Sequence, residues 1–263
     1  MTDTLPTILS ISGHDPSGGA GIQADIEALI SQGCRVCTVV TALTSQNSRN
    51  VRQIFPQPAE HVLEQCNLLI QDRPIDVIKI GLLGDAETAR QLADFIAGLQ
   101  KIPVILDPVL AAGGGLSVAN QELIDTIISH LLTCTTVLTP NSHEARILTN
   151  SSNDLDQCGQ ELVSLGCKNV LITGTHEEGS TVINRLYNET GLVESFQWDR
   201  LPHTYHGSGC TLASSIAAML AHGFEPLTAV MEAQEYTWNA LQAGYQPGTG
   251  QHLPDRLFWT QDD

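Results

Sequence analysis

The chain has 263 residues, of which 42% are hydrophobic and 16% charged, as is typical of a soluble α/β protein. Its formal charge at pH 7 is −17, so nucleic acid and anionic membrane surfaces are poor partners, because both select clustered lysine and arginine. Since the only lysines are Lys79, Lys101 and Lys168, a bound phosphate would depend mainly on backbone amides, helix N-termini and a metal ion.

Short apolar segments alternate with segments of helical periodicity along the whole chain. This alternation predicts an α/β protein with a doubly wound, mostly parallel sheet, and the absence of a linker or repeat predicts one domain over residues 1–263. Strands are expected at 7–12, 35–42, 76–80, 103–107, 135–139 and 169–174, followed by an antiparallel pair at 180–188 and 192–198. Helices are expected at 19–33, 58–72, 86–99, 120–132, 141–149, 154–165, 208–222 and 226–243.

The N-terminal region and the cysteines bear on localisation. The first ten residues lack a basic region followed by an apolar run, so no signal peptide is predicted, and no segment predicts a membrane helix. The seven cysteines are odd in number and scattered, which predicts reduced thiols and a cytoplasmic protein. Cys34 and Cys37 form a CxxC pair inside a predicted strand, so a metal or redox role for them is the minor alternative.

A glycine-rich turn follows the first predicted strand, in the segment SGHDPSGGAGIQAD at 12–25. It matches neither G-x-G-x-x-G nor G-x-x-x-x-G-K-[ST], so a dinucleotide or P-loop site is not predicted. The turn either lets backbone amides touch a small flat ligand or only packs the following helix on the sheet. Asp25, taken alone, is expected to be a solvated residue of that helix.

Polar residues follow three other strands, where open α/β sheets bind their ligands. Gln46 could recognise the edge of a heterocycle by donating and accepting together, or it is only a loop residue. Asp107 either caps a turn or helps to hold a hydrated divalent cation. Asn141 and Glu144 either face a ligand from the start of a helix or form a capping box.

The segment HGSGC at 206–210 precedes a helix rich in alanine, isoleucine and leucine. Glycines on both sides of Ser208 leave the amides at this helix start open, so that they could stabilise a developing negative charge. The helix dipole is expected to lower the pKa of the Cys210 thiol into the range of roughly 3.5–7.5, where a thiolate could act as a base. The alternative is an inert cysteine under a glycine cap.

In this order, the segments ILSISGHDPSGGAGIQADIEAL, TALTSQN, IKIGLL, LDPV, TPNSHEA and HGSGCTLASSIAA resemble the hydroxymethylpyrimidine/phosphomethylpyrimidine kinases of the ribokinase-like superfamily. The resemblance covers nearly the whole chain. It implies one three-layer α/β/α domain, often paired into homodimers. It also implies an ATP- and Mg²⁺-dependent kinase that phosphorylates 4-amino-5-hydroxymethyl-2-methylpyrimidine (HMP) and then its monophosphate, in thiamine diphosphate synthesis. Pyridoxal or pyridoxine kinase activity and a non-catalytic pyrimidine-binding protein are the alternatives.

The resemblance also implies roles for individual positions. The pyrimidine would be bound by Gly13, Ala20, Gln46, Leu82 and Val109, with Asp25 near its hydroxymethyl group. The anion hole would consist of Gly207, Ser208 and Gly209, with Cys210 in the position of the basic aspartate of most of the superfamily. The ATP site would include Asn141, Glu144, Thr173 and His176, and the magnesium would be supported by Asp107 and Glu144.

Three positions depart from the family pattern. Thr173 replaces a phosphate-binding lysine, and Gly113 stands where a flap lysine is common. Both changes remove positive charge near the phosphates, so the sequence leaves open whether this chain catalyses the second phosphorylation. Tyr205 replaces a small residue and is expected to narrow the phosphate region.

Overall fold

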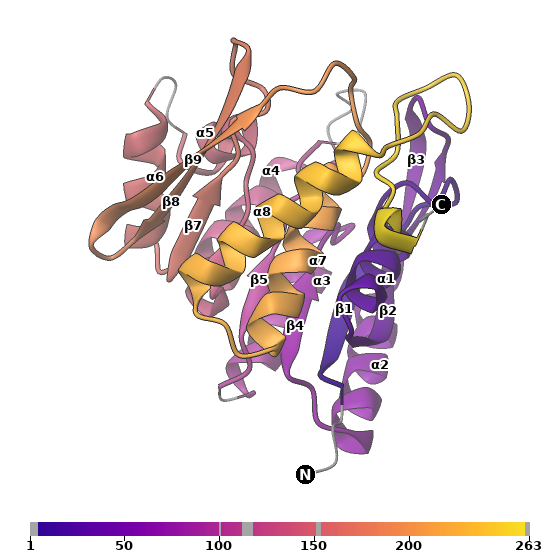
Figure 1. Cartoon of the computed structure of the whole chain (residues 1–263). Coiled ribbons are helices and arrows are strands. Elements are labelled where there is room, and N and C mark those ends of the chain that lie inside the picture. Colours follow the sequence, from indigo (N-terminus) through magenta and orange to yellow (C-terminus); the bar gives the residue numbers. More distant parts are fainter. Residues whose placement is uncertain (1–4, 100, 112–117, 151–153, 261–263) are drawn as a thin grey trace.

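The computed structural model describes residues 5–99, 101–111, 118–150 and 154–260 (Figure 1). The flap position Gly113 lies outside these residues. The strands are β1 (Thr7–His14), β2 (Arg35–Gln46), β3 (Val51–Pro56), β4 (Val77–Ile80), β5 (Val104–Leu106), β6 (Val137–Leu138), β7 (Asn169–Ile172), β8 (Thr181–Asn188) and β9 (Gly191–Asp199). The helices are α1 (Gly21–Ser31), α2 (Ala59–Asp72), α3 (Ala86–Ala97), α4 (Gln121–Thr126), α5 (Ser142–Leu148), α6 (Leu155–Ser164), α7 (Ser208–Ala221) and α8 (Pro226–Gln242).

Within the described residues the strands form one nine-stranded sheet in the order β3-β2-β1-β4-β5-β6-β7-β8-β9. Neighbours from β2 through β1 to β7 pair in parallel, whereas β3, β8 and β9 pair antiparallel to their neighbours. The strand order grows outward from β1 in both directions, which is the mark of a doubly wound sheet. The predicted α/β class and the antiparallel pair at 180–199 are therefore confirmed.

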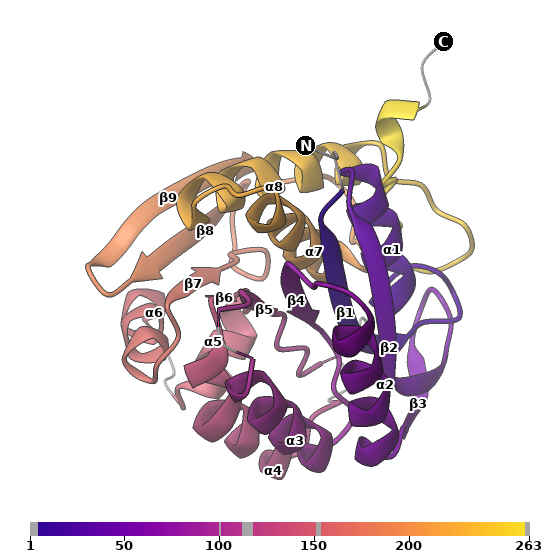
Figure 2. The same cartoon turned by 90° about the horizontal axis from the view of Figure 1, so that it is seen from below.

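Helices cover both faces of the sheet, so the predicted three-layer α/β/α arrangement is confirmed. Alternate residues of β1 point to opposite faces, with Ile8 in one apolar core and Leu9 in the other. Helices α1, α7 and α8 pack on the Ile8 face, and α2 to α6 pack on the Leu9 face (Figure 2). Burial on both faces explains why β1 is apolar almost throughout.

The hairpin of β2 and β3 is the main difference from the sequence prediction. The second strand was expected to end at residue 42, but β2 continues to Gln46 and returns as β3, which the sequence analysis did not predict. The hairpin lies at the sheet edge, and most of β3 is exposed, so it lacks the apolar pattern of a buried strand. The turn is closed by Asn47, whose side chain accepts from the amides of Arg49 and Asn50 at 2.9 and 3.2 Å.

Smaller elements also differ from expectation. The expected helix at 120–132 begins as α4 and continues as a π-helical turn, η1 (Ile127–Leu131), then as a 3₁₀ turn, η2 (Leu132–Cys134). A further 3₁₀ turn, η3 (Phe258–Thr260), follows the loop after α8. In the described part of the chain, no helix has the length and apolar character needed to span a membrane.

Candidate active site

A cavity of about 770 Å³ opens at the carboxyl ends of the parallel strands. Its wall comes from the turn after β1, the hairpin of β2 and β3, the loops after β4 to β7, the segment that follows β9 and the start of α7. The predicted positions that line it are Gly13, Ala20, Gln46, Leu82, Asp107, Val109, Asn141, Glu144, Thr173, His176, Gly207, Ser208, Gly209 and Cys210. Tyr205 also lines the cavity. The fold thus brings these residues into one space, and their individual roles stay predictions.

Asp25 does not belong to the cavity wall, and the expectation of a solvated carboxylate is wrong. Its side chain is fully buried, and Lys79 Nζ donates to its two oxygens at 2.8 and 3.0 Å. The hydroxyls of Ser10 and Ser214 donate to the same carboxylate at 2.6 and 2.8 Å. Helix α1 turns this face toward the sheet and α7, where the buried ammonium compensates the charge. Asp25 therefore lies in the protein interior, and the role implied for it near the hydroxymethyl group stays a prediction.

Lys79 was not assigned a role from the sequence, although a lysine in the apolar strand DVIKI is itself a signal. Its side chain is fully buried on β4, and such a charge needs a buried partner. Asp25 raises the pKa of Lys79 against the opposing effect of burial, so the ammonium form persists. The Lys79 ammonium lies close enough to Cys210 and Asp107 to lower the pKa of both groups.

Cys210 lies in the first turn of α7, in the wall of the cavity. The expectation of a lowered pKa is wrong, because burial raises the pKa of this thiol to about 12. Lys79 acts in the opposite direction, while the carboxylates of Asp107 and Asp25 add to the increase. Loss of hydration and the neighbouring acidic groups thus disfavour the thiolate. The thiol in turn acts to lower the pKa of Asp107.

Glycine is required where α7 begins. Gly207 is the N-cap with φ of 89°, a left-handed conformation, and a Cβ there would lie 1.9 Å from the carbonyl oxygen of Gly19. The turn at 207 therefore packs directly against the turn after β1. The amides of residues 208–210 belong to the first helical turn, so they have no acceptor within the helix. Residues 208–210 line the cavity, where amides without an acceptor are suited to an anion.

Asp107 and Glu144 are two buried acidic residues of the cavity wall, in addition to Asp15. Burial raises the pKa of Asp107 to about 6, and burial with repulsion from Asp107 raises the pKa of Glu144 to about 8. Asn141 and Glu144 form the predicted capping box of α5, with Asn141 N donating to Glu144 Oε2 at 2.9 Å. The capping alternative is confirmed, and both residues also line the cavity.

This pair of carboxylates fits a hydrated magnesium ion. The described residues contain no group of three or more His, Cys, Asp or Glu side chains that could hold a metal ion. Magnesium, however, is held in many kinases by one or two carboxylates, with water and substrate phosphates completing its shell. Two mutually repelling carboxylates beside an anion-binding helix start meet that requirement, because a divalent cation would restore their ionised forms.

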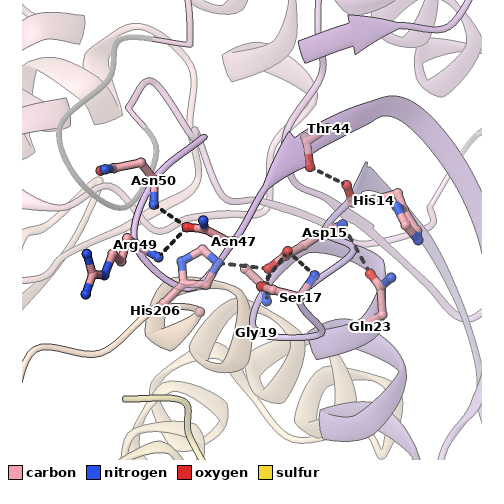
Figure 3. A network of polar contacts seen from close by, with 12 residues as sticks. His14, Asp15, Ser17, Gly19, Gln23, Thr44, Asn47, Arg49, Asn50 and His206 are labelled. Atoms are coloured by element: carbon pink, nitrogen blue, oxygen red, sulfur yellow. Dashed lines mark hydrogen bonds and ion pairs between the residues drawn. The ribbon is translucent and has the colours of Figure 1, made fainter. Parts of the chain in front are cut away.

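Asp15 and His206 are site residues that the sequence analysis missed (Figure 3). The Asp15 carboxylate accepts from the amides of Ser17 and Ala20, both at 2.8 Å, and from the Ser17 hydroxyl at 2.7 Å. His206 Nε2 lies 2.8 Å from the same carboxylate. These hydrogen bonds lower the pKa of Asp15 despite its burial. The Asp-Pro-Ser sequence could have signalled this turn, since aspartate commonly caps amides two residues ahead.

Gln46 lies close to the same network, and its side chain helps to lower the pKa of Asp15. It stands at the end of β2, opposite Val51 of β3, so a strand and not a flexible loop positions it. Gly13, Ala20 and Leu82 line the cavity with it. The arrangement offers an amide, apolar contacts and backbone groups to a flat ring, as recognition of a heterocycle requires.

The far side of the cavity contains Thr173, His176 and further residues that were not predicted. Thr173 is bound through its backbone, with its amide donating to the carbonyl of Pro140 at 2.9 Å. His176 stacks on His143 with ring centroids 4.8 Å apart, and burial together with His143 lowers the pKa of His176. Trp198 and Trp238 form a stacked aromatic pair in the same wall, with ring centroids 6.2 Å apart.

Arg200 also lines this side, where Thr173 replaces the lysine of the family pattern. Its guanidinium donates to the carbonyls of Gly179, Thr175 and Glu177 at 2.7, 2.7 and 2.6 Å. Arg200, which follows β9, thereby holds the loop after β7. Its guanidinium supplies positive charge on the side of the cavity where Thr173 stands in place of the lysine.

A doubly wound sheet with a cavity at its strand ends, lined by a glycine-capped helix start and buried carboxylates, is the architecture of small-molecule kinases of the ribokinase-like class. Solved structures agree with this class. A Bacillus subtilis pyridoxal kinase bound to ADP superimposes with a TM-score of 0.90 at 26% identity, covering 98% of this chain and all of that one (100%). The phosphomethylpyrimidine kinase of Clostridium difficile 630 has a TM-score of 0.78 at 28% identity, covering 90% and 100%.

Sequence comparison identifies the family. The family model described as phosphomethylpyrimidine kinase matches residues 15–255. A hydroxymethylpyrimidine/phosphomethylpyrimidine kinase of Streptomyces coelicolor is 35% identical, over 94% of this chain and 93% of that protein. Its counterpart in Aquifex aeolicus is 32% identical, over 94% and 98%. The chain therefore belongs to the phosphomethylpyrimidine kinase family.

Proposed function

We propose that this protein is an ATP- and Mg²⁺-dependent kinase that phosphorylates the hydroxymethyl group of HMP and then the resulting monophosphate. The observation that carries the proposal is the shared cavity, in which Gln46 and Ala20 face the same space as the amides of residues 208–210. A pyrimidine held at the first position presents its substituent toward the second. The names of the relatives, at 35% and 32% identity, support the same substrate.

In the proposed mechanism, the amides at 208–210 stabilise negative charge on the transferred phosphoryl group, while Gln46 and Asp15 orient the ring. Asp107 and Glu144 would hold a bound Mg²⁺, which would supply positive charge to neutralise the phosphates. Cys210 Sγ accepts the proton of the attacking hydroxyl only as a thiolate. In the ligand-free protein the pKa of this thiol is about 12. Cys210 therefore acts as the base only when a cation bound near Asp107 lowers the pKa of the thiol.

Product analysis tests the proposal directly. The purified protein is incubated with HMP and Mg–ATP, and the products are separated and weighed by mass spectrometry. We expect the monophosphate first and the diphosphate afterwards. If only the monophosphate accumulates, the first activity holds and the second step is lost, as the replacement of a lysine by Thr173 would explain. Absence of both products refutes the proposed function.

Pyridoxal kinase activity is the second candidate, and the TM-score of 0.90 to a pyridoxal kinase favours it. Pyridoxal also carries a hydroxymethyl group on a flat ring. Measuring kcat/KM for HMP and pyridoxal with one enzyme preparation separates the candidates, and a preference for pyridoxal would reverse our assignment. Calorimetry addresses the non-catalytic alternative, because a pyrimidine-binding protein without kinase activity would not bind Mg–ATP.

We further propose that residues 1–263 form one domain, that two copies associate, and that the protein is cytoplasmic. One sheet runs through the described residues, which supports the first point. Leu43 and Phe55 of the edge hairpin are 46% and 41% exposed, which supports an interface there. The seven cysteines are free thiols, consistent with a reducing compartment. Light scattering measures the mass in solution, and a monomer would refute the association.

A further inference from the structure

Arg256 lies near the end of the chain, between α8 and η3, and has no role in the activity described above. Its side chain is almost completely buried, with 2% of the residue exposed. Arginine is rarely buried unless all of its charge is compensated, because removal of a guanidinium from water is costly. Its partners therefore show what this charge does at that place in the fold.

The guanidinium joins two parts of the active site. Its Nη2 donates to the carbonyl of Gly19 at 2.5 Å, and its Nε donates to Thr211 Oγ1 at 2.9 Å. The hydroxyl of Thr211 donates in turn to the carbonyl of Gly207 at 2.8 Å. In the remaining contact Nη1 donates to Glu27 Oε2 at 2.9 Å, so the Glu27 carboxylate on α1 balances the charge of the guanidinium. A continuous chain of hydrogen bonds thus runs from the turn after β1 to the start of α7.

The turn after β1 and the turn at the start of α7 are in direct contact next to Arg256. A Cβ at Gly207 would lie 1.9 Å from the Gly19 carbonyl oxygen and 2.7 Å from Arg256 Nη2. The first turn continues into Ala20, which faces the pyrimidine position, and the second begins the anion-binding amides. The C-terminal segment that carries Arg256 lies beside α1 in Figure 1, and the turn at 15–19 is seen next to His206 in Figure 3. Arg256 itself does not line the cavity.

We propose that Arg256 is a positioning residue for phosphoryl transfer, which holds the turn that binds the acceptor ring in register with the turn that binds the transferred phosphoryl group. The fork of the guanidinium suits this role, because it donates in three directions from one rigid plane. Its charge also lies beside Gly207, in a chain with few lysines. A displacement of about 1 Å between reacting groups can cost about 10²-fold in rate. The proposal rests on the proposed kinase function.

The test compares Arg256→Lys and Arg256→Gln with wild type and with the control Arg185→Gln. Arg185 pairs with Asp156 at 3.6 Å, outside the cavity. For each protein, kcat and KM for HMP and for Mg–ATP are measured, and urea unfolding gives the folded fraction under assay conditions. The variant Arg256→Ala is also assayed with and without added guanidinium at a concentration that leaves wild type unaffected, with ethylammonium as the comparison cation.

We expect Arg256→Gln to lower kcat per folded molecule by about 10- to 100-fold, with KM changed less than about threefold. Arg256→Lys should fall between Gln and wild type, and guanidinium but not ethylammonium should raise the rate of Arg256→Ala. A loss of activity equal to the unfolded fraction, or full kcat in Arg256→Gln, would overturn the proposal. If wild type itself phosphorylates neither HMP nor pyridoxal, the proposed function fails. In that case the Arg256 inference, which rests on the same function, falls with it, whereas an active wild type with full kcat in Arg256→Gln overturns the Arg256 inference alone.

Discussion

The imidazole Nε2 of His206 lies 2.8 Å from Oδ2 of Asp15, across a sequence separation of 191 residues. This contact joins the turn that follows β1 to the residue that precedes the anion-binding amides. Asp15 is also the acceptor for the amides of Ser17 and Ala20. One buried carboxylate thus fixes the shape of the first turn and its position against the second.

The Asp15 carboxylate should contribute stability at neutral pH. Because its pKa is lowered in the folded state, this contribution is present above the unfolded value of 3.8 and is lost as the pH falls through the folded pKa. We expect Asp15→Asn to reduce the free energy of unfolding at pH 7 by about 1–3 kcal/mol, the scale of hydrogen bonds to a charged group. Urea unfolding measures this, with the exposed Asp94→Asn as control. A variant as stable as wild type at pH 7 would contradict the role assigned to Asp15.

Replacement of Gly207 by alanine should damage the anion-binding turn beyond the cost of backbone strain. Gly207 and Gly223 have nearly equal φ values of 89° and 88°, but only Gly207 has a carbonyl oxygen 1.9 Å from the added Cβ. Both variants incur about 1–2 kcal/mol for a left-handed alanine. We expect Gly207→Ala to lower kcat by about 10²-fold or more, whereas Gly223→Ala keeps its rate. Similar kcat values in folded Gly207→Ala and Gly223→Ala would contradict this prediction, because they would show that the contact with the Gly19 carbonyl oxygen does not affect catalysis.

The Cys210 thiol is predicted to act as the base. Cys210→Ala should therefore reduce turnover by about 10²-fold or more, and Cys134→Ala, outside the cavity, should not. Because the pKa of Cys210 in the ligand-free protein is raised to about 12, the wild-type kcat/KM for HMP should increase as the pH rises above neutrality, and Cys210→Ala should lose that dependence. Single-turnover rates across this pH range provide the measurement. Unchanged turnover in Cys210→Ala would remove the base assignment and leave the fold assignment intact.

The ligand-free protein should lose stability as the pH rises from about 4.5 to about 8, through Glu144. Its folded pKa of about 8 exceeds the unfolded value of 4.5, so the folded state binds more protons in this window and its stability declines with pH. Each unit of pKa difference corresponds to about 1.4 kcal/mol. Glu144→Gln should flatten this decline, unlike the exposed Glu122→Gln, in urea unfolding at pH 5, 6.5 and 8. Parallel declines in both variants would exclude Glu144 as the cause.

Gln46 should determine affinity for the pyrimidine more than the rate of transfer. Gln46→Ala removes a side chain that faces the cavity, and the loss of one hydrogen bond of about 1 kcal/mol raises KM for HMP about fivefold. The matched control is Gln53→Ala, an exposed position on β3. Comparison of HMP with pyridoxal in both variants tests ring recognition. If both substrates were affected equally, Gln46 would not distinguish the two rings.

Several parts of the fold could be predicted from the sequence because their signals are local. The apolar segment of β1 and the N-cap of α3, where Asp85 accepts from the amide of Thr88 at 2.7 Å, depend on neighbouring residues alone. The capping box of α5 is equally local. By contrast, β3 is a polar edge strand whose pairing with β2 depends on the hairpin and not on its own pattern. Arg256 reaches its partners only through the packing of the C-terminal segment on α1 and α7.

The sequence by itself determined the alternation of strands and helices and the order of segments that defines the family. It also determined the glycines at 207 and 209 that leave the amides of residues 208–210 accessible. Only the tertiary structure decided the charge states of the site. Asp25 on helix α1 is paired with Lys79 on strand β4, and the pKa of Cys210 is raised although its helix position favours a thiolate. The physical reason is that ionisation depends on solvent exclusion and on charges a few ångströms away, and residues distant along the chain supply both.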